Sequence, residues 1–173
     1  MRTSVVLALV ALAATFATGR ASLTSTAQSA GLTSLVAAVQ YAGLTSTLDN
    51  LKAGTILAPD NEAFDNLLTT LNATRLTQLN KALVAEVLQY HVLPTSTKST
   101  AFKNDEELKP LGPKGSTLAV SVSGKTVIFE PSSGVSPATI IKADVPVSNT
   151  TVLVDVIDEV LVPIEVAELV GLA

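Results

Sequence analysis

The two halves of this sequence follow different hydrophobic periods, and that switch constrains the fold more than any other feature. In residues 32–39, 64–71 and 79–88, apolar side chains recur every three or four positions, which is the spacing of helices that bury one face. In residues 118–123, apolar side chains alternate with Ala and Ser, which is the period of a half-buried β-strand. Helices followed by strands predict an α+β fold.

Turn-forming residues divide the rest of the chain into predicted elements. The helix over residues 79–88 should begin near Thr77 and end near His91, because Pro94 disfavours helical backbone just before it. Strands are expected at residues 55–58, 118–123, 126–129, 140–145 and 152–162, and loops at the acidic run 105–107 and at 131–137. The last strand is almost continuously apolar, so we expect both of its faces to be buried. No internal repeat or linker divides the chain, which predicts a single domain.

The composition predicts an aliphatic core and excludes several functions. Hydrophobic residues make up 47% of the chain, whereas aromatic residues make up only 3% and Trp is absent. The absence of Cys excludes disulfides, thiolate zinc sites and cysteine nucleophiles. A formal net charge of -4 repels phosphate backbones and anionic membranes, so we expect no nucleic-acid binding.

The first 21 residues have the pattern of a signal peptide. Arg2 provides a positive start, residues 5–14 are uniformly apolar, and the small residues Gly19 and Ala21 fit the positions before a cleavage site. The apolar run is shorter than the roughly 20 residues that span a bilayer. We therefore expect secretion after cleavage at Ala21, which leaves nine basic against 15 acidic residues, a formal charge of -6.

The mature chain carries two candidate glycosylation sites and no expected membrane anchor. The sequons at Asn72 and Asn149 are candidates if the protein is secreted by a eukaryote; in a bacterium they carry no such meaning, and such triplets also arise by chance in Thr-rich sequences. Glu165 and Glu168 interrupt the apolar C-terminal segment, so a GPI anchor is not expected. These features predict a soluble product.

Three segments, in this order, resemble the fasciclin (FAS1) domain of the beta-Ig-H3/fasciclin family. Residues 55–64, Thr-Ile-Leu-Ala-Pro-Asp-Asn-Glu-Ala-Phe, resemble its first motif, and residues 90–94, Tyr-His-Val-Leu-Pro, resemble its central motif. Residues 152–163, Val-Leu-Val-Asp-Val-Ile-Asp-Glu-Val-Leu-Val-Pro, resemble its closing motif. The resemblance covers residues 31–164, leaving an N-terminal extension and a C-terminal tail, residues 22–30 and 165–173.

The resemblance implies a wedge-shaped β-sandwich with helices packed against it. It also implies an extracellular or cell-surface protein that mediates adhesion through integrins, matrix components or cell-wall glycans. The Tyr-His region is implicated in receptor contact in some animal members. If this role is carried over, the resemblance assigns a partner contact to Tyr90, His91, Val92 and Leu93. A structural role is the favoured alternative, because a single His beside apolar residues is more often a satisfied core group.

The residues of these motifs also have structural explanations. Asp60 and Asn61 can cap the helix after Pro59, and a protonated His91 would be favoured by a helix C-terminus. Two departures from the family pattern are Leu57 in place of Phe and Asp155 in place of His. A buried Asp155 needs a partner, and we hypothesise His91 or a backbone donor. We expect structural roles for Thr55, Pro59, Asp60, Asn61, Phe64, Asp155 and Asp158, with the two aspartates on opposite faces of the last strand.

No catalytic, cofactor or metal site is predicted. His91 is the single histidine, and no Gly-x-Ser-x-Gly turn supplies a nucleophile for it. The acidic runs 60–62 and 105–107 lack the spacing of a calcium loop, and no phosphate-binding glycine loop is present. We therefore expect a non-enzymatic protein that uses no cofactor.

Two functions remain open on the sequence. The leading prediction is a secreted adhesion or extracellular-matrix module whose surface binds a receptor, a matrix protein or a second copy of the chain. The alternative is a module that binds matrix or cell-wall polysaccharide. Sugar-binding sites often stack aromatic rings on the sugar, and the five aromatic residues left after signal removal disfavour that alternative.

Overall fold

The strands of the computed structural model form one bent, seven-stranded sheet in the order β2-β1-β7-β6-β5-β4-β3. The structure describes residues 22–148 and 150–172, so the predicted signal peptide and Asn149 lie outside the described residues. The strands are β1 (Ala53–Pro59), β2 (Val92–Leu93), β3 (Glu106–Leu108), β4 (Leu118–Ser123), β5 (Thr126–Pro131), β6 (Ala138–Pro146) and β7 (Thr151–Ile157). Only β1 and β7 pair in parallel; the other neighbouring pairs among these strands are antiparallel.

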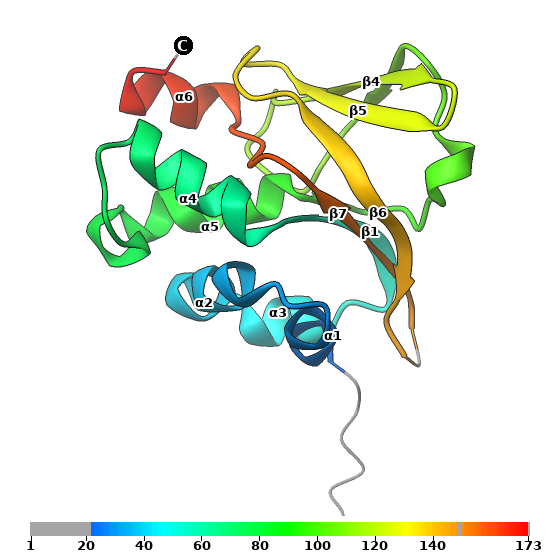
Figure 1. Cartoon of the computed structure of the whole chain (residues 1–173), viewed down its shortest axis with the longest axis horizontal. Helices are drawn as coiled ribbons and strands as arrows, with labels where there is room; N and C mark the ends of the chain where they lie inside the picture. The colour runs from blue at the N-terminus through cyan, green and yellow to red at the C-terminus, as the bar shows by residue number, and fades with distance from the viewer. Residues whose placement is uncertain (1–21, 149, 173) are drawn as a thin grey trace, which may run out of the picture.

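Strand β6 joins the two halves of the sheet. Its first residues pair with β5, and the rest of the strand pairs with β7 through a ladder that is interrupted twice. Asp144, at the second interruption, has a φ of 56°, the left-handed conformation common at irregular strand positions. The interruptions let one strand take part in both halves, so the sheet folds over on itself as a sandwich (Figure 1).

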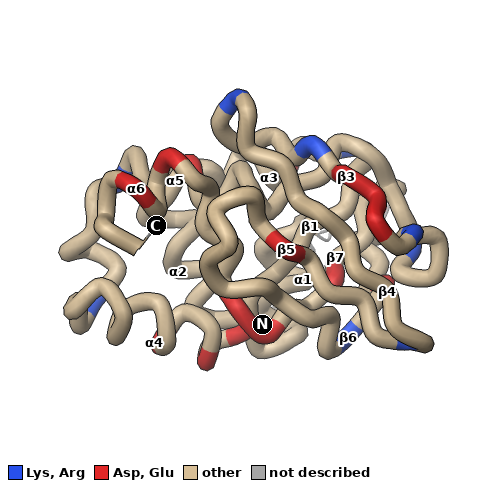
Figure 2. The backbone as a smooth tube through the Cα atoms, turned by 90° about the horizontal axis from the view of Figure 1, so that it is seen from above, with Lys and Arg blue, Asp and Glu red and all other residues tan. Residues whose placement is uncertain are grey.

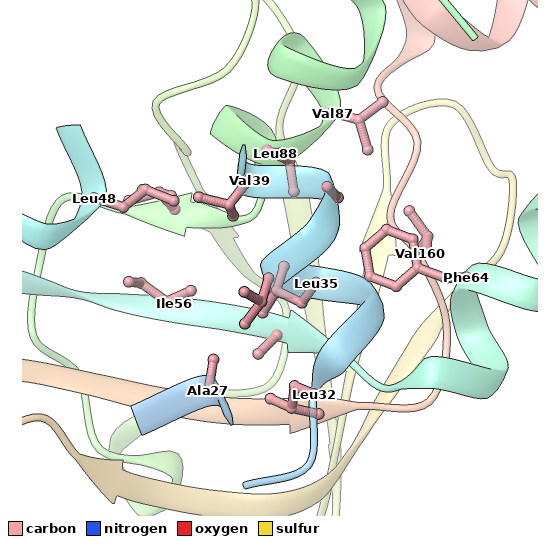
Figure 3. Packing of buried hydrophobic residues seen from close by; sticks show 14 of the residues in the cluster. Ala27, Leu32, Leu35, Val39, Leu48, Ile56, Phe64, Val87, Leu88 and Val160 are labelled. Carbon is pink, nitrogen blue, oxygen red and sulfur yellow. The ribbon is translucent and has the colours of Figure 1, made fainter. Parts of the chain in front are cut away.

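Helices cover the outer face of the β1–β7 half of the sheet (Figure 1). They are α1 (Leu23–Ser29), α2 (Thr33–Ala42), α3 (Thr45–Asp49), α4 (Asn61–Thr70), α5 (Lys81–Tyr90) and α6 (Ile164–Val170). A first apolar cluster fills the space between helices and sheet, where Leu35 and Val39 of α2 meet Ile56 of β1 (Figure 3). A second cluster lies inside the sandwich and includes Leu57 and Phe129. The predicted α+β class is confirmed.

The ends of the described chain are part of the core. The expected N-terminal extension forms α1, which buries Leu23 and Ala27, and its cap is Ser22, whose hydroxyl accepts a hydrogen bond from the Ser25 N–H. The expected C-terminal tail forms most of α6, which buries Val166. Both segments contribute to the first apolar cluster.

Three predicted boundaries are wrong for identifiable reasons. Helix α5 begins at Lys81 with Asn80 as its cap, whereas residues 76–78 near the expected start at Thr77 form a separate 3₁₀ turn. Glu106 and Glu107 of the acidic run expected as a loop belong to β3, because β4 offers a free edge to pair with. The last strand ends at Ile157 rather than at Val162, so Asp158 lies beyond it.

Candidate functional site

His91 is buried within the Tyr-His motif, with 2% of its surface exposed and both ring nitrogens bonded. Its Nδ1 lies 2.7 Å from the carbonyl oxygen of Val87, and its Nε2 accepts a hydrogen bond of 3.0 Å from the Leu161 N–H. Because a backbone N–H can only donate, Nε2 must be unprotonated and Nδ1 must carry the proton. Nε2 therefore holds the Leu161 backbone against the end of α5, while Nδ1 bonds back to that same helix.

Burial lowers the pKa of His91 to about 4, although the bond to the Val87 carbonyl opposes the shift. The imidazole is thus neutral at physiological pH. The expectation that a helix C-terminus favours the protonated form is wrong here, because desolvation of the cation outweighs the helix dipole. With neither nitrogen free, His91 has no capacity to act as a general base in this structure.

All four residues of the predicted partner contact are buried. Tyr90 is 0% exposed and its hydroxyl donates a 2.6 Å hydrogen bond to the Thr117 carbonyl, while Val92 and Leu93 are each 2% exposed. Gly112 lies against this tyrosine so closely that a Cβ there would stand 2.9 Å from the Tyr90 Cα. These side chains anchor the core, so a direct contact with a partner receives no support from this conformation and stays a prediction.

Asp155 is fully buried and bonds to a backbone donor rather than to His91. Its Oδ1 accepts a 2.6 Å hydrogen bond from the Asp144 N–H, and its Oδ2 has no partner among the described residues. Burial raises the pKa of Asp155 to about 6, and the bond from Asp144 only partly offsets that shift. Of the two hypothesised partners, the backbone donor is the one that the structure contains.

The Asp155 contact continues into a short polar network. The Asp144 carboxylate accepts hydrogen bonds from the N–H and the hydroxyl of Ser99, at 2.9 and 2.7 Å. Asp155 thereby connects β7 to the irregular part of β6 and, through it, to the turn at residues 99–101. The two aspartates support backbone geometry, and among their described bonds there is no basic side chain that could activate the Ser99 hydroxyl.

The remaining motif residues hold connections between elements. The Thr55 hydroxyl accepts from the Thr97 N–H at 2.8 Å and lies 3.0 Å from the Thr95 carbonyl, which binds the segment after β2 to β1. Asp158, placed after β7, accepts from the Thr139 N–H at 2.6 Å. Because Asp158 lies beyond the strand, the prediction that Asp155 and Asp158 point to opposite faces of one strand is wrong.

The corner between β1 and α4 is built as the sequence predicts. Pro59 is the last residue of β1, and the Asp60 carboxylate accepts a 2.8 Å hydrogen bond from the Ala63 N–H as the helix cap. Asn61 instead links two helices, since its Oδ1 accepts from the Ser34 N–H at 2.9 Å at the start of α2. Phe64 is 3% exposed and packs in the first apolar cluster (Figure 3).

Residues 22–148 and 150–172 contain neither a metal cluster nor a membrane-spanning helix. No group of three or more His, Asp or Glu side chains is placed to hold a metal ion there. Likewise, none of the described helices is long and apolar enough to cross a membrane.

Asn72 is available for modification. It is exposed in a left-handed conformation, with a φ of 51°, just after α4. When the chain is expressed through a eukaryotic secretory pathway, we expect glycosylation there, visible as a gel shift that glycosidase removes. Asn72→Gln should remove one glycan increment, and Asn66→Gln, a nearby Asn outside a sequon, should leave mobility unchanged. An unshifted wild-type band would contradict the prediction.

The structure contains a hollow beside the β4–β5 turn that was not predicted from the sequence. It has a volume of about 520 Å³ and lies between the β4–β5 turn, β6 and the segment 99–102. We call it the hairpin hollow; it is lined by Ser99, Thr100, Phe102, Val122, Gly124, Lys125, Val127, Ile140, Ile141 and Ala143. Ile141 is 54% exposed. The adjacent pair Ile140-Ile141 could have indicated an exposed apolar side chain in this strand. Neighbouring strand residues point to opposite faces, so one of the two must point away from the core.

Comparisons with known proteins agree with the geometry. The Fasciclin domain model matches residues 30–163. The chain is 33% identical over 118 residues to "Fasciclin-like arabinogalactan protein 10" of Arabidopsis thaliana, covering 66% of this chain and 26% of that protein. It is 31% identical over 112 residues to "Protein sll1483" of Synechocystis sp., covering 63% of this chain and 54% of that protein.

A solved structure shares the fold. It is a FAS1 domain pair from the insect cell adhesion molecule fasciclin I, with a TM-score of 0.61, 19% identity and coverage of 78% of this chain and 46% of that one. The present chain thus spans between about a quarter and about half of the length of these relatives. The expected FAS1-type sandwich is confirmed, and the chain belongs to the fasciclin domain family.

Proposed function

We propose that this protein is a secreted, non-enzymatic adhesion module of the extracellular matrix that binds a protein partner through its surface. The observation that carries the proposal is the hairpin hollow, where Ile141 exposes an isoleucine side chain that the core does not use. The polar motif residues bond within the fold, which leaves recognition to the outer surface. The insect protein that shares this fold is a cell adhesion molecule, which supports the same class of function.

The lining of the hollow favours a protein partner with an apolar side chain beside an acidic one. Ile141 and Ile140 supply aliphatic surface, and Lys125 adds a positive charge at the β4–β5 turn in a chain that is acidic overall. Phe102 also lines the hollow, but its ring makes an edge contact with Phe129, 5.2 Å between centroids, and is 5% exposed. With that ring buried, the hollow lacks an open aromatic platform for sugar stacking.

Ile141→Asp is expected to weaken partner binding at least tenfold, because central apolar contacts dominate interface energies. The matched control is Leu111→Asp, which places the same charge at another exposed aliphatic residue, 48% exposed and outside the hollow. Mature protein would be used in pull-downs from extracellular extract and, in parallel, on a polysaccharide array. The captured protein would then be titrated against both variants.

Two outcomes would overturn the proposal, and a third would identify the partner. Equal losses of partner binding in Ile141→Asp and Leu111→Asp would show that the partner does not bind at the hollow. Binding to polysaccharides alone would reverse the ranking of protein over glycan, in line with the arabinogalactan name of one plant relative. Concentration-dependent dimerisation that Ile141→Asp abolishes would make the partner a second copy of the chain.

A further inference from the structure

A second concavity lies at the other end of the molecule, among α4, α5, α6 and the segment 71–80. Its volume is about 190 Å³. Phe64, Val87 and Val166 belong to its buried floor, and the side chains of Phe64 and Val87 are drawn in Figure 3. Phe64 and Val162 are the lining residues that fall within the family motifs, and the proposed adhesion surface uses none of the lining.

The lining is almost entirely aliphatic. Leu76, Leu79 and Leu83 are partly exposed and belong to the lining as well, so apolar side chains lead from the surface to the floor. No charged residue is part of the lining. Such a lining suits an apolar ligand, since an engineered, enclosed cavity of roughly 150 Å³ lined by Leu, Ile and Phe binds benzene.

Two amide side chains are the polar members of the lining. The Gln78 Oε1 accepts a hydrogen bond from the Thr74 N–H, and the Asn80 Oδ1 accepts one from the Ala82 N–H at the start of α5. Their oxygens are therefore occupied, whereas their side-chain N–H groups donate no bond among the described residues. Polar donors of this kind suit a ligand whose polar end carries an oxygen acceptor.

The charges of the surrounding helices disfavour an anionic ligand. Helices α4, α5 and α6 and the segment 71–80 carry two basic residues, Arg75 and Lys81, against five acidic residues: Glu62, Asp65, Glu86, Glu165 and Glu168. Figure 2 shows acidic positions on α5 and α6. A carboxylate or phosphate at the cavity would meet this negative field, whereas an uncharged polar end would not.

We propose that this cavity binds the end of an uncharged aliphatic chain, such as that of a fatty alcohol or a neutral ester. By comparison with the roughly 150 Å³ cavity that takes the six carbons of benzene, a volume of about 190 Å³ holds roughly six carbons of a chain. The remainder of a longer chain would leave through the ring of leucines.

A series of 1-alkanols from butanol to decanol tests the proposal on the mature protein at pH 7.4. Binding would be followed by methyl NMR, which reports both the dissociation constant and the residues that contact the ligand. Each methylene up to about six carbons should tighten binding about fourfold, the factor expected for burying one methylene. Beyond that length the gain should level off, and shifts should concentrate on the lining methyl groups. Octanoate should bind at least fivefold more weakly than 1-octanol.

Variants locate the site. Leu76→Gln should weaken 1-hexanol binding at least tenfold, whereas Leu51→Gln, at another half-buried leucine outside the cavity, should change it less than twofold. Val170→Gln, close to the C-terminus, is the second variant if Leu76→Gln does not fold. Binding without a chain-length dependence, equal losses in lining and control variants, or tighter binding of octanoate would each overturn the proposal.

Discussion

Asp155→Asn is expected to gain about 2 kcal/mol of stability relative to wild type on going from pH 4 to pH 8. Burial raises the pKa of the wild-type carboxyl to about 6, from its ordinary value of 3.8 in the unfolded chain. A group with a raised folded-state pKa contributes stability that is fully present below pH 3.8 and is lost as the pH rises through 6. A difference of one between the folded and unfolded pKa corresponds to about 1.4 kcal/mol, and asparagine has no such titration.

The pH dependence is the decisive measurement, because the substitution also has a pH-independent cost. Asparagine keeps an oxygen for the Asp144 N–H, but its amide N–H groups replace Oδ2, which has no partner among the described residues. Urea unfolding followed by circular dichroism from pH 4 to 8 separates the two effects. Asp65→Asn, at an exposed position on α4, is the matched control and should track wild type. A difference between Asp155→Asn and wild type that stays constant with pH would contradict the prediction.

His91→Ala should lower the free energy of unfolding at pH 7 by about 3 to 5 kcal/mol. The substitution removes a buried ring and leaves both the Leu161 N–H and the Val87 carbonyl without their side-chain partner. His91→Gln is the informative companion, because an amide can donate to one group and accept from the other. It should recover part of the loss, as measured by urea unfolding at pH 7. Equal losses in the two variants would mean that volume, not hydrogen bonding, sets the cost.

The same histidine should also make the protein sensitive to acid. Its folded pKa of about 4 lies below its ordinary value of 6.5, so its stabilising effect is present above pH 6.5 and is lost as the pH falls toward 4, by about 3 kcal/mol in total. The contribution of Asp155 has the opposite sign over nearly the same range. We expect the two to offset each other in wild type. Asp155→Asn should expose the loss in acid, and His91→Gln should show stability rising as the pH falls.

The sequence alone determined the elements whose signals are local. The amphipathic period of 64–71 and the Asp60 cap specify α4 without help from the rest of the chain, because the cap bonds three residues along and the helix buries one face. The alternation of β4, with its turn at Gly124, specifies the β4–β5 hairpin in the same way. The buried, structural character of the motif residues also followed from their apolar neighbours.

Tertiary structure decided everything that depends on a distant partner. Apolar residues continue past β7, yet the strand ends at Ile157, and the Leu161 N–H farther along bonds to a histidine 70 residues away. The protonation of that histidine, the backbone partner of Asp155 and the two concavities likewise arise from segments that meet only in the folded chain. A linear pattern records which face of an element is apolar. It does not record which other element covers that face, and burial and pKa depend on that cover.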